Sequence, residues 1–301
     1  MENSKLITVV YMGDLPQMYL HAKSLAKFWR GPKRLTIILE DSIDAKYWCE
    51  KHILPILEGW VVDFFGPHNL KAKDGWHSQQ ILRLLAAREA KEDWSIILGA
   101  GNVLVRDFFI YDLYKDNKVI VDVHTGNPSQ SQIAAASILG INPMSVVESW
   151  NITPFCWNTQ IINDLFTELD KKNINLTELE SFEWTEATLY WNYAQNKLPW
   201  YKGSRVITTG IFGGLTRASR LPWQHFLDRI QQCKDDYNVK IFNMHRFHIT
   251  PQVTDELFKF YKEIGIVDDS DITFYKTLFK ESIKFLRFNV QQILYEDWKN
   301  G

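Results

Sequence analysis

The stretch that decides the fold is Asp74-Gly75-Trp76-His77-Ser78-Gln79-Gln80-Ile81-Leu82-Arg83-Leu84, followed at residues 94–102 by Trp-Ser-Ile-Ile-Leu-Gly-Ala-Gly-Asn. The first part is typical of a helix that begins at Gly75. The second predicts a buried strand over 94–98 that breaks into a glycine-rich turn. In open α/β sheets, ligands bind just beyond the carboxyl ends of strands. The turn Gly99-Ala100-Gly101-Asn102 is therefore the first place where we expect chemistry.

Strands and helices are expected to alternate around this stretch. The pattern predicts strands over 6–12, 34–39, 60–65 and 94–98, separated by helices over 14–29, 44–57 and 75–90. Asp14-Leu15-Pro16-Gln17 has the form of an N-cap, an early proline and a capping-box glutamine. This alternation predicts an α/β fold with a Rossmann-like, mostly parallel central sheet flanked by helices.

The second half of the chain is less regular and predicts a mixed, largely helical part. We expect strands over 118–123, 205–209 and 239–244, and helices over 128–139, 155–169, 177–196, 250–264 and 271–298. A capping box formed by Thr177 and Glu180 supports the third of these helices, and a flexible loop is expected over 210–214. Because no repeat or linker interrupts the sequence, a single domain over 1–301 is the economical interpretation.

Composition narrows the function classes. The chain has 301 residues and a net charge of −2, which argues against a broad basic face but not against a local basic groove. Tryptophan, tyrosine and phenylalanine are plentiful. Their rings suit stacking on sugars or bases, although most rings in proteins belong to the core.

The cysteines and the hydropathy pattern bear on location. Cys49, Cys156 and Cys233 are far apart, so neither a zinc site nor a disulfide framework is expected. The sequence starts without the pattern of a signal peptide, and no apolar run reaches about 18 residues. We therefore expect a cytoplasmic protein without a membrane span.

Two neighbouring segments are candidates for ligand binding. The glycines of the turn 99–102 leave room for a phosphate or sugar to approach the backbone, and the alternative is a plain tight turn. It matches neither a P-loop nor a dinucleotide fingerprint. The helix start around Trp76, Gln79 and Gln80 offers amides, a ring and unpaired N–H groups to an anion or a sugar. The alternative there is a solvated first turn with a buried tryptophan.

Two further segments offer acid–base chemistry. Glu186 and Tyr190 lie four residues apart on one face of a predicted helix, so Glu186 is a candidate general base. The commoner alternative is an acid that faces solvent. His245 and Arg246 follow a predicted strand and suit the neutralisation of a diphosphate. The strand end at Asp122-Val123-His124 is a similar but weaker candidate. Ordinary polar residues at a strand end are the alternative.

Taken in order, these motifs resemble a family of GT-A-like glycosyltransferases of bacteria and phages. The family pattern is Asp-Gly-Trp-x-x-Gln-Gln-x-x-Lys-Leu, a short strand ending in a DxD-like acidic motif, Thr-Pro-Phe, a (Ser/Thr)-Glu-x-x-x-Tyr helix and a late His-Arg. The matching positions here are Asp74-Gly75-Trp76, Gln79-Gln80, Arg83-Leu84, Thr153-Pro154-Phe155, Thr185-Glu186 with Tyr190, and His245-Arg246. The correspondence spans roughly residues 5 to 250.

The resemblance implies a nucleotide-sugar donor, a UDP-sugar, at the carboxyl edge of the sheet. Residues 1–125 would form the nucleotide-binding half, 126–250 the acceptor half and 251–301 the C-terminal helices. By resemblance, Glu186 would act as the base or contact the sugar. The implied donor-binding residues are Tyr11, Asp14, Trp76, Gln79, Gln80, Arg83, Gly99, Gly101, Asn102, His245 and Arg246.

One departure from the family pattern stands out. Where the family places its DxD-like acids, this chain has Gly99-Ala100-Gly101-Asn102, and a divalent cation such as Mn²⁺ or Mg²⁺ prefers carboxylate oxygens. Three readings stay open. Transfer is independent of a metal; or other groups, among them Asn102, Asp122 and His245, hold the metal; or the fold persists as an inactive binding or interaction protein.

The acceptor is also open. It is a saccharide or, if the chain comes from a phage, a modified DNA base. DNA binding would require a cationic groove, for which Lys71, Lys73, Arg83 and Arg88 are the candidates. The oligomeric state is not indicated by the sequence.

Overall fold

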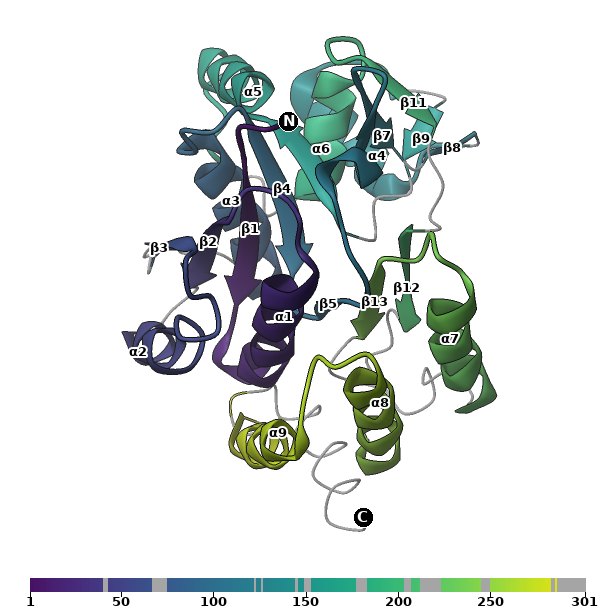
Figure 1. Cartoon of the computed structure of the whole chain (residues 1–301). Helices are drawn as coiled ribbons and strands as arrows, with labels where there is room; N and C mark the ends of the chain where they lie inside the picture. The colour runs from purple at the N-terminus through teal and green to yellow at the C-terminus, as the bar shows by residue number, and fades with distance from the viewer. Residues whose placement is uncertain are drawn as a thin grey trace.

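A computed structural model of the chain (Figure 1) describes residues 1–39, 43–66, 75–121, 123–125, 127–143, 146–148, 153–176, 183–202, 207–211, 223–244, 250–282 and 285. Its centre is a five-stranded sheet with the strand order β10-β4-β1-β2-β3. The strands are β1 (Ser4–Val10), β2 (Arg34–Leu39), β3 (Val61–Phe65), β4 (Trp94–Gly99) and β10 (Phe155–Asn158). The first four pair in parallel, and β10 runs antiparallel to β4. The prediction of an α/β fold with a mostly parallel central sheet is therefore confirmed.

The order of the strands creates a switch point beside β1. The chain goes from β1 to β2 and β3 on one side, and then returns to place β4 on the other side of β1. In the pairing of β1 with β4, Val9 lies opposite Gly99. In open α/β sheets, a crevice for ligands forms at such a switch point, beyond the carboxyl ends of the two strands.

Helices cover both faces of the sheet because alternate residues of each strand point to opposite faces. From β1, Leu6 and Val10 join a cluster with α1 (Leu15–Phe28), α2 (Ile43–His52), α7 (Trp223–Asp235), α8 (Pro251–Glu263) and α9 (Asp269–Ser282). Ile7 and Val9 join a second cluster with α3 (Gly75–Arg88), α4 (Gln130–Leu139), α5 (Thr159–Lys171) and α6 (Glu186–Ala194).

Smaller sheets extend the framework. The one that bears on the site has the order β12-β13-β5, formed by β12 (Thr208–Ile211), β13 (Ile241–Met244) and β5 (Asn102–Leu104). The others are β11-β7-β6, from β11 (Trp200–Lys202), β7 (Lys118–Val121) and β6 (Tyr114–Lys115), and β8-β9, from β8 (Val123–Thr125) and β9 (Val146–Glu148). Short 3₁₀ turns occur at η1 (Met12–Asp14) and η2 (Ile110–Asp112).

Several element predictions need correction. Residues 155–158 form strand β10 rather than the start of a helix, and α5 begins only at Thr159, where the Asn158 side chain accepts a hydrogen bond from the Ile161 N–H. Residues 183–185 are not helical. Helix α6 begins at Glu186 with Thr185 as its N-cap, whereas the predicted cap at Thr177 and Glu180 lies outside the described residues.

The predicted capping box at the start of α1 is also wrong. Asp14 makes no side-chain capping hydrogen bond, because the preceding 3₁₀ turn gives it φ −104° and ψ 3° instead of the extended backbone that an N-cap needs. Helix α2 ends at His52, before Pro55. The expected loop over 210–214 begins with Gly210 and Ile211 in β12, and the rest of it lies outside the described residues.

None of the helices in the described ranges combines the length and the apolar character needed to cross a lipid bilayer.

Candidate active site at the carboxyl edge of the sheet

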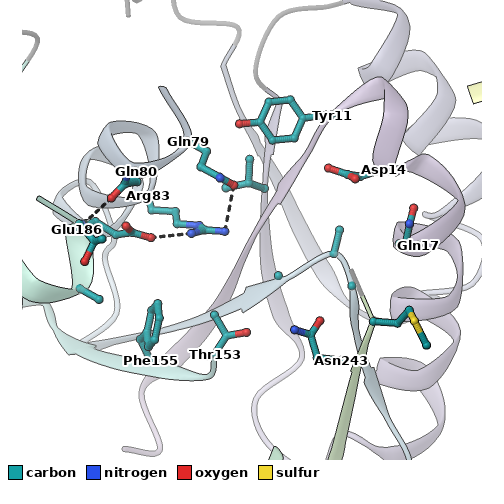
Figure 2. Close-up of a pocket in the computed structure, with 17 residues that line it drawn as sticks. Tyr11, Asp14, Gln17, Gln79, Gln80, Arg83, Thr153, Phe155, Glu186 and Asn243 are labelled. Carbon is teal, nitrogen blue, oxygen red and sulfur yellow. Dashed lines mark hydrogen bonds and ion pairs between the residues drawn. The ribbon is translucent and has the colours of Figure 1, made fainter. Parts of the chain in front are cut away.

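A cavity of about 340 Å³ lies at the switch point between β1 and β4 (Figure 2). Its wall is built from the segments that follow these two strands, the first turns of α1 and α6, the second and third turns of α3, the start of β10 and the end of β13. The residues that line it are Val9, Tyr11, Asp14, Gln17, Gln79, Gln80, Arg83, Gly99, Ala100, Gly101, Thr153, Phe155, Thr185, Glu186, Ala187, Asn243 and Met244.

The cavity brings together most of the residues that the sequence singled out. Tyr11 and Asp14 come from the segment after β1, while Gly99 and Gly101 come from the turn after β4. The remaining predicted residues on the wall are Gln79, Gln80, Arg83 and Glu186. Positions that are 103 residues apart in sequence, Arg83 and Glu186, are therefore neighbours in space.

Other predicted residues are not on the described wall. Asp122, His245 and Arg246 lie outside the described residues, as does the side chain of Trp76. Strand β13 ends at Met244, and Asn243 and Met244 both line the cavity. Asn102 lies behind the wall and is fully buried.

An ion pair crosses one side of the cavity. The Nη1 of Arg83 lies 2.6 Å from the Oε1 of Glu186, and both side chains are largely buried, with exposed fractions of 13% and 6%. The Nη2 of Arg83 donates to the Oε1 of Gln79 at 3.3 Å. Helix α6 is joined to α3 a second time, because the backbone N–H of Glu186 donates to the Oε1 of Gln80 at 3.0 Å. This network fixes the carboxylate of Glu186 at the cavity wall.

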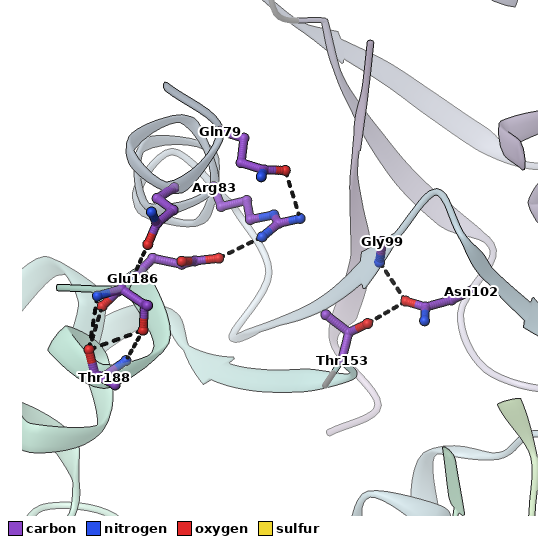
Figure 3. Close-up of polar contacts among 9 residues, drawn as sticks. Gln79, Arg83, Gly99, Asn102, Thr153, Glu186 and Thr188 are labelled. Carbon is purple, nitrogen blue, oxygen red and sulfur yellow. Dashed lines mark hydrogen bonds and ion pairs between the residues drawn. The ribbon is translucent and has the colours of Figure 1, made fainter. Parts of the chain in front are cut away.

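Asn102 organises the turn after β4. Its Oδ1 accepts hydrogen bonds from the backbone N–H of Gly99, at 2.6 Å, and from the hydroxyl of Thr153 (Figure 3). Its backbone carbonyl accepts from His21 Nδ1 at 2.5 Å. A carbonyl only accepts, so Nδ1 carries the proton and Nε2 accepts from the Thr8 hydroxyl at 3.2 Å. Burial lowers the pKa of His21 to about 4, although the Asn102 carbonyl opposes the shift, and the ring is therefore neutral at pH 7.

The two glycines of the turn differ in their surroundings. A Cβ on Gly101 would lie 2.9 Å from the carbonyl oxygen of Met244, so only glycine lets the turn approach β13 this closely. A Cβ on Gly99 would meet its nearest atom, the Oδ1 of Asn102, at 3.4 Å, which is ordinary contact. The backbone that approaches Gly101 closely is that of β13, and Gly101 also lines the cavity.

Sequence reasoning missed Gln17 as a site residue and assigned it to a capping box instead. Its side chain lines the cavity and is 5% exposed, and no described residue gives its Oε1 or Nε2 a hydrogen bond. The sequence does contain a signal that Gln17 faces the interior. It lies four residues before His21 on α1, and residues at that spacing share a helix face.

The described residues do not fit a divalent cation at this turn. Gly99 and Gly101 have no side-chain ligands, and the Oδ1 of Asn102 is already engaged by two donors. Within the described ranges, no group of three or more His, Cys, Asp or Glu side chains is placed to hold a metal ion. Of the candidate cations for a DNA groove, Arg83 pairs with Glu186, and the exposed Arg88 has its guanidinium over the ring of Phe166 at 4.5 Å. Lys71 and Lys73 lie outside the described residues.

Comparison with known proteins gives a family match and distant similarities to solved structures, of which two follow. The structure is similar to a mannosyltransferase, Ktr4p, from S. cerevisiae, with 12% identity, a TM-score of 0.43 and coverage of 62% of this chain and 64% of that one. It is also similar to the apo form of the glycosyltransferase GlyE from Streptococcus pneumoniae TIGR4, with 10% identity, a TM-score of 0.44 and coverage of 94% and 63%. The chain thus spans less than two thirds of either protein.

No curated protein matches the sequence. A family model matches residues 8–201, a range that begins in β1 and ends in β11, and contains α3, the turn after β4 and α6. Since this range is more than half of the chain, the protein belongs to the family of unknown function DUF6492.

Proposed function

We propose that this protein is a glycosyltransferase with a GT-A-like fold, which transfers a sugar from a nucleotide-sugar donor to an acceptor hydroxyl. The observation that carries the proposal is the cavity at the switch point. It gathers Tyr11, Asp14, Gln79, Gln80, Arg83 and Glu186 where an open α/β sheet binds its ligands.

The proposed reaction replaces one bond at the anomeric carbon of the sugar with another. The acceptor oxygen forms the new bond to this carbon while the bond to the diphosphate breaks, and the electron pair leaves with the diphosphate. Glu186 takes the proton of the acceptor hydroxyl. Its position at the wall, fixed by Arg83 and by the amide of Gln80, supports this role. In this proposal the donor is a UDP-sugar, and the acceptor is a saccharide, with a modified DNA base as the alternative.

Arg83 is the proposed partner of the diphosphate. Among the described residues of the wall it supplies the one guanidinium, beside the two carboxylates of Asp14 and Glu186. Arginine suits this task because its planar fork matches the oxygens of a phosphate. We propose that the charge of the leaving group is met by Arg83, together with His245 and Arg246, without a metal ion at the turn 99–102.

The same geometry favours a second candidate function, a binding protein without turnover. The carboxylate of Glu186 is already paired with the guanidinium of Arg83 at 2.6 Å, so that one of its oxygens is held by a cation rather than directed at an acceptor hydroxyl. The positions of the acidic motif are occupied by Gly99 and Gly101. A protein of this kind would keep the ligand cavity and would lack transfer.

Titration calorimetry with UDP and a set of UDP-sugars, with and without Mn²⁺, tests the proposal, together with an assay for release of UDP. Binding with turnover that disappears in Glu186→Gln supports a transferase. Binding without turnover supports the second candidate. If none of these ligands binds, both candidates are wrong.

A further inference from the structure

A polar stripe runs along the face of α1 that packs on β5. Gln17, His21 and Ser24 occupy this face at the spacing i, i+4 and i+7, and all three are buried. On a helix that packs into a core, buried polar side chains are expected to hold hydrogen bonds. Each member of the stripe therefore calls for a partner.

Two members of the stripe have partners, and both partners are backbone groups of β5. The hydroxyl of Ser24 accepts from the backbone N–H of Leu104 at 3.0 Å, and Nδ1 of His21 donates to the carbonyl of Asn102 at 2.5 Å. Moving one turn towards the start of α1 therefore moves about two residues back along β5. The next step leads from His21 to Gln17, and from Asn102 to the turn at Ala100, which lines the cavity.

Gln17 is the member without a partner. No described residue bonds its Oε1 or its Nε2, and both atoms are buried. A buried amide that makes no hydrogen bond is destabilising, because each of its polar groups has lost water without gaining a partner. Since the amide holds no bond, rotating it towards the cavity, which the side chain already lines, breaks none. A ligand in the cavity is the group that can complete the stripe.

We infer that Gln17 is a specificity residue, whose amide binds a hydroxyl-bearing ring of the ligand. This inference rests on the proposed function. The amide offers an acceptor oxygen and an NH₂ group that donates, and a pair of neighbouring ring hydroxyls can donate to the one and accept from the other. Two rings of a nucleotide-sugar carry such hydroxyls, the ribose and the transferred sugar.

The test compares wild type, Gln17→Leu and Ser24→Ala by calorimetry and by thermal unfolding. Leucine keeps most of the volume of Gln17 and removes the amide. Gln17→Leu is expected to raise the Kd for UDP-glucose roughly tenfold while the apo protein melts at the same or a higher temperature. Ser24→Ala, on the same helix face, is expected to lower the melting temperature and to leave the Kd unchanged.

Comparing three ligands shows which ring carries the hydroxyls that Gln17 binds. If the ribose is bound, Gln17→Leu weakens UDP but not 2′,3′-dideoxy-UDP. If the transferred sugar is bound, the substitution weakens UDP-glucose but not UDP. Either result supports the inference.

Two results overturn it, and they differ in what they say of the proposed function. An unchanged Kd for every ligand in Gln17→Leu, with a lower melting temperature, makes Gln17 a structural residue and leaves the proposed function standing. If wild type binds neither UDP nor UDP-glucose, the proposed function is wrong and this inference is wrong with it. Gln17→Ala serves as the second variant should leucine prevent folding.

Discussion

Arg83 on α3 and Glu186 on α6 form a nearly buried ion pair, with a single close contact of 2.6 Å between Nη1 and Oε1. The pair lies in the wall of the cavity, and Arg83 is also the proposed binder of the ligand's phosphates. A phosphate and Glu186 therefore compete for one guanidinium. Removing the carboxylate of Glu186 is therefore expected to strengthen the binding of a diphosphate and to weaken the fold.

Removing the charge of Glu186 should tighten the binding of a nucleoside diphosphate. Glu186→Gln takes away both the competitor for Arg83 and a like charge near the diphosphate, so we expect the Kd for UDP to fall by roughly tenfold, while any transfer activity falls by about 10²–10⁴. Calorimetry with UDP measures the first effect. The control is Glu183→Gln, which removes the same charge from an exposed side chain nearby. Weaker binding in Glu186→Gln than in Glu183→Gln would contradict the competition.

Removing either partner of the pair should destabilise the fold. Glu186→Ala leaves a buried guanidinium without its carboxylate, and we expect a loss of about 3–5 kcal/mol in the free energy of unfolding. The double variant Arg83→Met/Glu186→Ala should recover part of this loss because no buried charge stays unpaired. Urea unfolding of the two single variants and the double variant gives the coupling energy. A coupling near zero would mean that the pair contributes nothing to stability.

The two glycines of the turn should respond differently to a methyl group. Gly101→Ala places a Cβ 2.9 Å from the carbonyl oxygen of Met244, and neither backbone can yield easily, so we expect a loss of about 1–3 kcal/mol. Gly99→Ala meets only the Oδ1 of Asn102 at 3.4 Å and should cost less than about 1 kcal/mol. Each variant is the control for the other in thermal unfolding. Equal losses would show that conformational freedom, and not the approach of β13, sets the need for glycine.

Acid should weaken the fold through His21. The pKa of this residue falls from 6.5 in the unfolded chain to about 4 in the folded protein, so the unfolded chain binds more protons between these values. The contribution of His21 to stability is therefore complete above pH 6.5 and declines as the pH falls to about 4, by on the order of 3 kcal/mol in total. Urea unfolding across this range measures the slope. His21→Gln should reduce it, and an unchanged slope in that variant would assign the acid sensitivity to other groups.

How much of the structure can be predicted from the sequence depends on whether the signal for each feature is local. The alternation of short apolar strands and helices predicted the parallel sheet, and the glycines after residue 98 marked the end of β4, where the cavity lies, because both follow from periods of a few residues. The strand at Phe155–Asn158 was missed because a short apolar run next to a helix fits either structure, and pairing with β4 decides it. The pair of Arg83 and Glu186 was not predictable from spacing, since the two residues are 103 positions apart.

At Gln17 the error came from a local signal, rather than from a missing one. Its residue type and position fit a capping box, and the local rule was applied where the backbone of Asp14 does not allow it. A buried polar group without a partner is a disagreement between local pattern and fold, and such disagreements are expected at functional positions.

Asn102 holds Gly99, Thr153 and His21 at once, so three distant parts of the chain meet at one side chain and its carbonyl. The turn 99–102 is therefore held in place by hydrogen bonds before any ligand binds. A molecule that contacts this turn meets a backbone that is already hydrogen-bonded, and ordering it there adds no cost to binding. The heat of association should therefore arise from polar contacts rather than from ordering of the chain.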